Sequence, residues 1–294
     1  MNSSLATATK FSFVTPPVAA RRIVHLERGH QSGPINRLMS PSDIGQLIKP
    51  FVFLDYGVVP FSGERLAGIH PHSGIATLTL PIRGGVVYED TTGKSGVVAA
   101  GGLEWMKAGG GVWHDGRVAG PGALQFYQLW VALPESEENA PPESQYISPP
   151  EVEQDGPARV LLGRLGNATS RIRAPSGMNY LHVRLRSGER WRYQPPAGHT
   201  VAWVSVYEGE LHTPAVVLPE TLAVFEESNA AIEFVATGDT SFVLGSAIKH
   251  PHELVMGYYS VHTNPLALER GEIEISRIGQ RLRSQGRLQK RITG

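Results

Sequence analysis

The stretch that decides the fold is AGIHPHSGIATLTL, residues 67–80. It places His70 and His72 on either side of a proline, directly before an apolar run that is typical of a β-strand. Successive side chains of a strand point to opposite faces, so residues two apart point the same way. The two imidazoles are therefore expected to converge on one point, which is the arrangement of a metal site.

A third histidine follows a glycine-rich turn. His114 lies near the end of AAGGLEWMKAGGGVWHDG, residues 99–116, where the glycines allow the chain to turn sharply and bring a later strand beside the first. Three neutral imidazoles at one point suit iron, zinc, copper or nickel. The chain has no cysteine, so a metal would be held by histidine, carboxylate and water, and disulfides are excluded.

The pattern of short apolar runs indicates an all-β protein. Runs rich in valine, isoleucine, leucine and aromatic residues recur along the 294 residues, separated by turns that use many of the 33 glycines and 22 prolines. The clearest are GIATLTLPI (74–82), GVVYED (85–90), NYLHVRLRSG (179–188) and TVAWVSVYEGEL (200–211). Such a series favours sandwiches or barrels.

Two segments depart from this pattern. Residues 139–157, NAPPESQYISPPEVEQDGP, are rich in proline, glutamate and serine and predict a linker between two β units. From Leu266 onward, Ile273, Ile278 and Leu282 recur at near-helical spacing, and Pro265 stands where a first-turn proline is tolerated. The sequence thus predicts barrels at 20–138 and 158–262, and a C-terminal helix and tail at 263–294.

Composition excludes several classes of partner. Lys and Arg number 27 against 27 Asp and Glu, so no direct nucleic-acid binding is expected. No run of 18 apolar residues occurs, so no membrane span is expected. Residues 1–22 lack an early basic region and a solid apolar block, and are interpreted as a flexible lead-in rather than a signal peptide. The absence of cysteine favours the cytoplasm.

Longer phrases resemble a known family. HPHSG (70–74), the stretch 84–116 ending in GGGVWHDG, and LQFYQLWVALP (124–134) are similar to the pirin family of the cupin superfamily. The opening GPINRLMSPSDIGQLIKPFVFLDYG (33–57) and the later QPPAGHTVAWVSVYEGEL (194–211) extend the resemblance over nearly the whole chain. The resemblance implies a bicupin, two antiparallel β-barrels in one chain, with metal in the first barrel only.

The resemblance also implies a ligand set. His70, His72 and His114 match the three histidines of the pirin site, but Gly116 stands where pirins have the glutamate ligand. The hypothesis is one divalent metal, Fe(II) first, with Zn, Ni, Cu or Mn as alternatives.

Carboxylates are missing from two positions of the pirin pattern. Besides Gly116, Ala76 replaces a second glutamate that usually follows H-P-H by four residues. The nearest acid, Asp115, would point away from His114 on a regular strand and would need a bulge to bind. Three outcomes are open: three histidines and water hold the metal, an acid such as Asp115 completes the shell, or the site is empty.

A second H-P-H occurs in KHPHELVMGYYSVHTN, residues 249–264. The segment of the second barrel that matches the metal strand is instead GERWRYQPPAG (188–198), where Gln194 and Pro196 replace the two histidines. The later cluster is therefore predicted to have a structural or surface role; its members are His250, His252, Glu253 and His262.

The other singled-out side chains are predicted to have no role at a site. Isolated histidines are interpreted as ordinary, namely His182, His199 and His212. A group of aromatic residues is predicted to fill a barrel: Trp105, Trp113, Phe126, Tyr127 and Trp130, with Trp113 turned away from His114.

The resemblance implies two functions from different classes. The first is a metal-dependent dioxygenase, similar to quercetin 2,3-dioxygenase, that acts on a flavonol-like aromatic substrate. The alternative is a non-catalytic regulatory module that binds a protein partner. Fold analogy alone does not choose between them, and no catalytic residue beyond the metal ligands is assigned.

Overall fold

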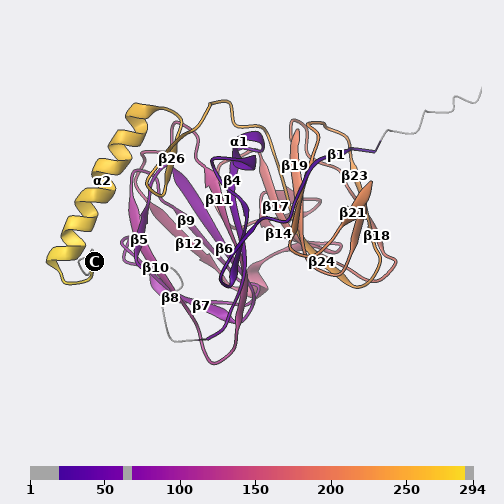
Figure 1. The fold of residues 1–294 in the computed structure, drawn as a ribbon, viewed down its shortest axis with the longest axis horizontal. Helices are drawn as coiled ribbons and strands as arrows, with labels where there is room; N and C mark the ends of the chain where they lie inside the picture. Colours follow the sequence, from indigo (N-terminus) through magenta and orange to yellow (C-terminus); the bar gives the residue numbers. More distant parts are fainter. Residues whose placement is uncertain (1–19, 62–67, 289–294) are drawn as a thin grey trace, which may run out of the picture.

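The computed structural model describes residues 20–61 and 68–288 (Figure 1). Residues 1–19, which hold most of the expected lead-in, lie outside the described residues, as do residues 289–294 of the expected tail. Antiparallel sheets dominate the rest, and the all-β bicupin prediction is confirmed. Neither α-helix in the described part of the chain is long and apolar enough to cross a membrane.

The first half of the chain forms two facing sheets. The larger has the order β12-β9-β6-β11-β4-β3-β2 and the smaller the order β5-β10-β7-β8. The larger sheet consists of β2 (His30–Ser32), β3 (Ile35–Met39), β4 (Phe51–Val59), β6 (Ile75–Arg83), β9 (Leu103–Lys107), β11 (Leu124–Ala132) and β12 (Glu143–Ile147). The smaller consists of β5 (His70–His72), β7 (Gly85–Asp90), β8 (Ser95–Ala99) and β10 (Val112–Val118). One helical turn, α1 (Ile44–Leu47), precedes β4 and was not predicted.

The second half repeats this plan. Its sheets have the orders β1-β22-β19-β24-β17-β14-β13 and β18-β23-β20-β21. The larger consists of β1 (Ile23–Glu27), β13 (Gln154–Asp155), β14 (Ala158–Leu162), β17 (Met178–Leu185), β19 (Val201–Glu208), β22 (Thr221–Phe225) and β24 (Thr240–Ala247). The smaller consists of β18 (Arg190–Tyr193), β20 (Leu211–Thr213), β21 (Ala215–Val217) and β23 (Ile232–Ala236). Two ribbons complete the strands: β15 (Arg164–Leu165) with β16 (Ala168–Thr169), and β25 (Val255–Gly257) with β26 (Ser260–His262).

The two halves share one hydrophobic core between their larger sheets. Phe51 of β4 meets Trp203 of β19 edge to face, with ring centroids 5.5 Å apart. The hydroxyl of Tyr127 lies 2.9 Å from Oγ of Ser205 across the same boundary. Trp105 and Tyr127, both expected to fill a barrel, are fully buried in this core.

Segments cross between the halves at two places. Although β1 begins the described chain, it pairs with β22 of the second half. The expected linker supplies β12 to the first half and β13 to the second, with a short 3₁₀ helix, η1 (Pro149–Glu151), between them. The proposed bounds at 20–138, 139–157 and 158–262 remain a prediction, and the linker is structured through these pairings.

The predicted C-terminal helix is α2 (Pro265–Ser284), which lies along one end of the first barrel (Figure 1). Its N-cap, Asn264, accepts a hydrogen bond from the backbone N–H of Ala267 at 2.9 Å. Ile273, which the near-helical spacing grouped with Ile278 and Leu282, lies on a different helix face and is 62% exposed. Ile275, not Ile273, shares a helix face with Ile278, since residues three apart are neighbours on a helix.

Candidate metal centre

Three imidazoles converge at one end of the first barrel. In the antiparallel register of β10 with β5, His114 lies opposite His70, and Val112 lies opposite His72. The Nε2 atom of His114 lies 3.1 Å from Nε2 of His72 and 3.0 Å from Nε2 of His70. Within residues 20–61 and 68–288, these histidines form the only group of three side chains with ligand atoms close enough for one metal ion.

The outer nitrogens of two rings are fixed by backbone carbonyls. Nδ1 of His70 lies 2.7 Å from the carbonyl oxygen of Gly68, and Nδ1 of His72 lies 3.0 Å from that of Tyr259. A carbonyl only accepts, so each Nδ1 carries the proton and each Nε2 presents a lone pair. Both of these lone pairs face Nε2 of His114, and the one proton that this nitrogen can carry would form a hydrogen bond with only one of them. The donor set therefore fits a cation at the point of convergence.

Burial favours the neutral form of all three rings. It lowers the pKa of His70, against opposing contributions from the Gly68 carbonyl and the Asp115 charge. Burial lowers the pKa of His72 and of His114 well below the ordinary value, and the neighbouring His70 adds to this. Neutral imidazole is the form that binds metal, so the site is prepared for a cation at neutral pH.

No carboxylate joins the three histidines in the described chain. The pairings of β10 run from Val112 to Val118 without a register shift, so the strand is regular and Gly116 shares the face of His114. Gly116 borders the cavity behind the imidazoles, and Ala76 is fully buried on β6. Asp115 is buried but does not belong to the group of converging ligand atoms. The converging set consists of three neutral ligands.

A cavity of about 210 Å³ adjoins the imidazoles, between the two sheets of the first half. Part of its wall is aromatic. Phe53 and Trp130 stack with ring centroids 4.0 Å apart, and the Trp130 ring meets that of His72 at 4.8 Å. The lining also includes Tyr88, Phe126 and Tyr259. Phe126 and Trp130 thus line a pocket, whereas Trp113 turns outward and donates from Nε1 to the carbonyl of Ile275 at 2.8 Å.

The cavity contains a carboxyl group that the sequence reasoning missed. Glu104 of β9 is 3% exposed, and its Oε2 accepts a hydrogen bond from Oγ1 of Thr79 at 2.8 Å. Burial, supported by the nearby Asp90 charge, raises the pKa of Glu104 to about 7. The available signal was one acidic residue inside the apolar run LEWM, because an acid in a buried strand needs a reason.

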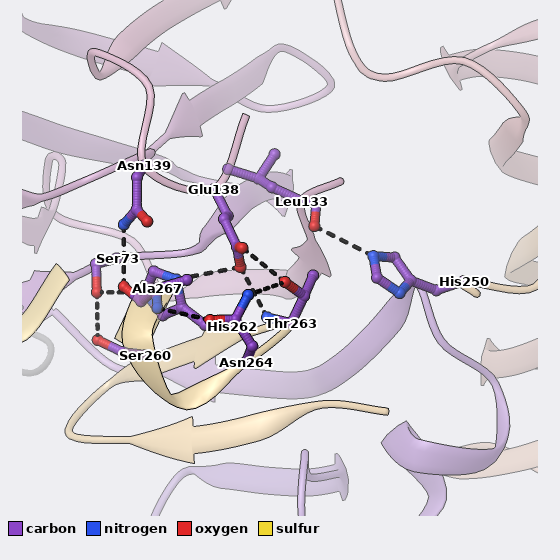
Figure 2. A network of polar contacts seen from close by, with 10 residues as sticks. All are labelled: Ser73, Leu133, Glu138, Asn139, His250, Ser260, His262, Thr263, Asn264 and Ala267. Carbon is purple, nitrogen blue, oxygen red and sulfur yellow. Dashed lines mark hydrogen bonds and ion pairs between the residues drawn. The ribbon is translucent and has the colours of Figure 1, made fainter. Parts of the chain in front are cut away.

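His262 from the second cluster belongs to a network of polar contacts that includes Ser73, the residue directly after β5 (Figure 2). Its Nε2 lies 3.0 Å from Oγ of Ser73, and its Nδ1 lies 3.2 Å from Oε2 of Glu138. This order matches that of a hydrolase triad, but all three residues are at most 1% exposed. Helix α2 covers them so closely that a Cβ atom at Gly271 would lie 2.4 Å from the serine oxygen. The network therefore anchors the helix.

The second H-P-H lies after β24, and its polar contacts connect it to the first half. Nε2 of His250 lies 3.2 Å from the carbonyl oxygen of Leu133 (Figure 2). Glu253 pairs with Nζ of Lys49 at 3.0 Å, while His252 lies 3.9 Å from Glu135. The three histidines interpreted as ordinary have separate partners: Tyr207 for His182, Ser246 for His199 and Glu210 for His212.

The equivalent interior of the second barrel is filled with apolar side chains. Phe234 packs against Phe242 with ring centroids 5.3 Å apart, and Trp191 stacks on Phe234 at 5.7 Å. Gln194 and Pro196, which the sequence comparison matches to His70 and His72 of the first barrel, lie just after β18. In the first half, the corresponding region holds the three imidazoles and the adjoining cavity.

Fold and site together define a bicupin with a three-histidine centre in its first barrel. The family model described as Pirin matches residues 23–131. A Pseudomonas aeruginosa protein, named as a candidate quercetin 2,3-dioxygenase, is 30% identical over 244 residues, which cover 76% of this chain and 84% of the relative. The chain belongs to the pirin family.

Solved structures share this fold. A quercetin 2,3-dioxygenase from Acinetobacter baumannii superposes with a TM-score of 0.75 at 25% identity, covering 88% of this chain and 96% of the other. A bacterial pirin from Escherichia coli, solved in complex with nickel(II), gives a TM-score of 0.61 at 20% identity, covering 76% of this chain and 99% of the other. The second likeness shows the fold alone.

Proposed function

We propose that this protein is a metal-dependent dioxygenase that acts on a hydroxylated aromatic compound, as a quercetin 2,3-dioxygenase does. The observation that carries the proposal is the convergence of three neutral Nε2 atoms beside an aromatic-walled cavity. The names of the Pseudomonas relative and the Acinetobacter structure support the same reaction class.

His70, His72 and His114 are the proposed ligands of one divalent ion. Fe(II) is the first choice, and Zn, Ni, Cu and Mn are the alternatives. When bound, the ion supplies a Lewis acid for the oxygen atoms of the substrate and a redox centre for dioxygen. The protein contributes by holding two of the rings in the required tautomer through the carbonyls of Gly68 and Tyr259.

The cavity walls orient the substrate and exclude water. The stacked pair Phe53 and Trp130 gives the cavity an apolar aromatic wall against which a substrate ring can pack. Arg37 lies over the outer part of this stack, 4.0 Å from the Phe53 centroid, and is paired with Asp55. The cavity, at about 210 Å³, is smaller than the roughly 300–1,000 Å³ of ordinary ligand pockets. We expect it to enclose the reacting ring rather than a whole flavonol.

The test is oxygen consumption with quercetin after anaerobic loading with Fe(II). The parent protein is expected to consume oxygen, and the double variant His70→Ala, His72→Ala is expected to lose this activity. The matched control is the double variant His250→Ala, His252→Ala, which removes both histidines of the second H-P-H sequence and leaves the first intact. Iron uptake without oxygen consumption would contradict the enzyme and favour the regulatory, protein-binding role.

A further inference from the structure

One carboxyl group of the metal cavity has no cationic partner within the described chain. Glu104 lines the cavity and is almost fully buried, yet it forms no ion pair among residues 20–61 and 68–288. The cavity also contains Asp55, which is paired through both carboxylate oxygens with Arg37. Because buried carboxylates are normally paired, the position of Glu104 points to a chemical role.

We propose that Glu104 is the proton acceptor of this site and takes the proton from the acidic hydroxyl group of the bound aromatic substrate. This inference rests on the proposed function, and it assigns a catalytic residue outside the three-histidine set. It also supplies the carboxyl group that Ala76 and Gly116 lack in comparison with the family pattern.

Neighbouring strands hold the Glu104 side chain in place. In the register of the larger sheet, Glu104 lies between Thr79 of β6 and Tyr146 of β12. The Thr79 hydroxyl is within hydrogen-bond distance of both Glu104, at 2.8 Å, and the Oε1 atom of Gln128, at 2.9 Å. One hydroxyl proton cannot serve both acceptors. Turning the Gln128 amide lets its Nε2 donate to Thr79, which then donates to Glu104.

The surroundings of Glu104 suit a group that both accepts and returns a proton. Burial and the Asp90 charge raise its pKa to about 7, so both protonation states are accessible near neutral pH. Asp90 is itself occupied, because it accepts hydrogen bonds from Ser144 at 2.6 Å and Tyr146 at 3.1 Å. The other titratable groups that line the cavity are Asp115, Tyr88, Tyr259, the three imidazoles and the ion pair of Arg37 with Asp55.

The proposed step balances without a further reactant. The substrate O–H bond breaks, its electron pair stays on the substrate oxygen, and a new O–H bond forms on the Glu104 carboxylate. A neutral hydroxyl and a carboxylate become an oxyanion and a carboxylic acid, so the net charge of the cavity is unchanged. The later return of the same proton restores the carboxylate.

The test measures the ionisation of a bound probe without turnover. Parent protein is loaded with Zn(II), which is not redox-active, and mixed without oxygen at pH 7 with quercetin or catechol, whose absorption moves to longer wavelength on ionisation. We expect the probe to be ionised when it is bound to the parent. The ionised fraction of bound probe should be at least tenfold lower with Glu104→Gln and intermediate with Glu104→Asp. Glu143→Gln, which removes a partly exposed carboxylate at the start of β12, is the control and is expected to match the parent.

A second measurement on the parent protein does not depend on a folded variant. Infrared difference spectra on probe binding are expected to show one new protonated carboxyl band. Its absence, or ionisation by Glu104→Gln equal to that of the parent with equal zinc content, would overturn the assignment.

The outcomes separate this inference from the proposed function. If the parent ionises the probe but the iron-loaded parent consumes no oxygen, the dioxygenase proposal is contradicted and the assignment of Glu104 as proton acceptor stands. Oxygen consumption with an un-ionised probe would remove only the Glu104 assignment. Failure of the parent to bind either probe would overturn both.

Discussion

The Nδ1 atom of His72 lies 3.0 Å from the carbonyl oxygen of Tyr259, a residue 187 positions later in the chain. Tyr259 forms the turn between β25 and β26, with a left-handed backbone angle φ of 54° that is uncommon for a residue other than glycine. A hairpin beyond the second barrel thus orients a proposed metal ligand of the first barrel. Metal binding is therefore expected to depend on the C-terminal segment.

Substitutions at Tyr259 test this dependence. Valine is β-branched and disfavours a positive φ, so Tyr259→Val should shift the turn and displace the carbonyl from His72. Loss of such an outer partner typically weakens metal affinity by about 10–100-fold. Tyr259→Gly tolerates the angle and retains the carbonyl, so its affinity should stay near that of the parent. Competitive chelation measures both, and equal affinity in the valine variant would contradict the proposed coupling.

Packing of α2 on the buried network gives a stability prediction. A Cβ atom at Gly271 would lie 2.4 Å from Oγ of Ser73 and 2.6 Å from Nε2 of His262. Gly271→Ala should therefore destabilise the fold by about 1–3 kcal/mol, despite the better helix propensity of alanine. Ile273→Ala on the exposed face of the same helix should change stability little. Denaturant unfolding compares the two, and an unchanged Gly271→Ala midpoint would show that the helix adjusts freely.

The missing carboxylate can be restored at Gly116. This residue shares a strand face with His114 and is not among the glycines with positive φ, so glutamate is compatible with its backbone. An anionic ligand added to three neutral imidazoles offsets part of the cation's charge. Gly116→Glu should raise the affinity for iron or zinc at least tenfold, about 1.4 kcal/mol. Chelator competition on folded protein that gives equal or weaker binding would mean that position 116 does not face the metal.

The raised pKa of Glu104 predicts a pH dependence of stability in the metal-free protein. The pKa is about 7 in the folded state against 4.5 as the ordinary value, so the unfolded chain loses its proton first as pH rises. The parent is therefore destabilised progressively between pH 4.5 and pH 7, on the order of 3 kcal/mol in total. Glutamine does not titrate, so Glu104→Gln lacks this loss. The free energy of unfolding of the variant minus that of the parent should therefore increase as pH rises over the same interval. Parallel pH profiles would contradict the shifted pKa.

The strands and the histidine cluster were predictable because both depend on local pattern. Period-2 alternation in the H-P-H stretch sends His70 and His72 to one side, and the turn before His114 returns a strand beside them. The same alternation correctly turned Trp113 away from the site, onto α2. Ile273 was misplaced because the spacing of five residues to Ile278 was accepted as helical, although the two lie on different faces.

The remaining parts of the site depend on long-range contacts that no local pattern contains. The pairing of β1 with β22 and the contact between His72 and Tyr259 join segments that are distant in sequence. Glu104 was overlooked because its role arises from the strands on both sides of β9, which only the folded sheet defines. A buried acid in an apolar strand is nevertheless a signal that sequence reasoning can use.

The most direct test of the central claim is metal content after loading and exhaustive dialysis, measured by elemental analysis. We predict about one divalent ion per chain in the parent and in His250→Ala, His252→Ala, and almost none in His70→Ala, His72→Ala, with all three proteins folded by circular dichroism. Full metal content in the His70 and His72 variant, or an equal loss in the His250 and His252 variant, would contradict the assignment of the metal to the first barrel.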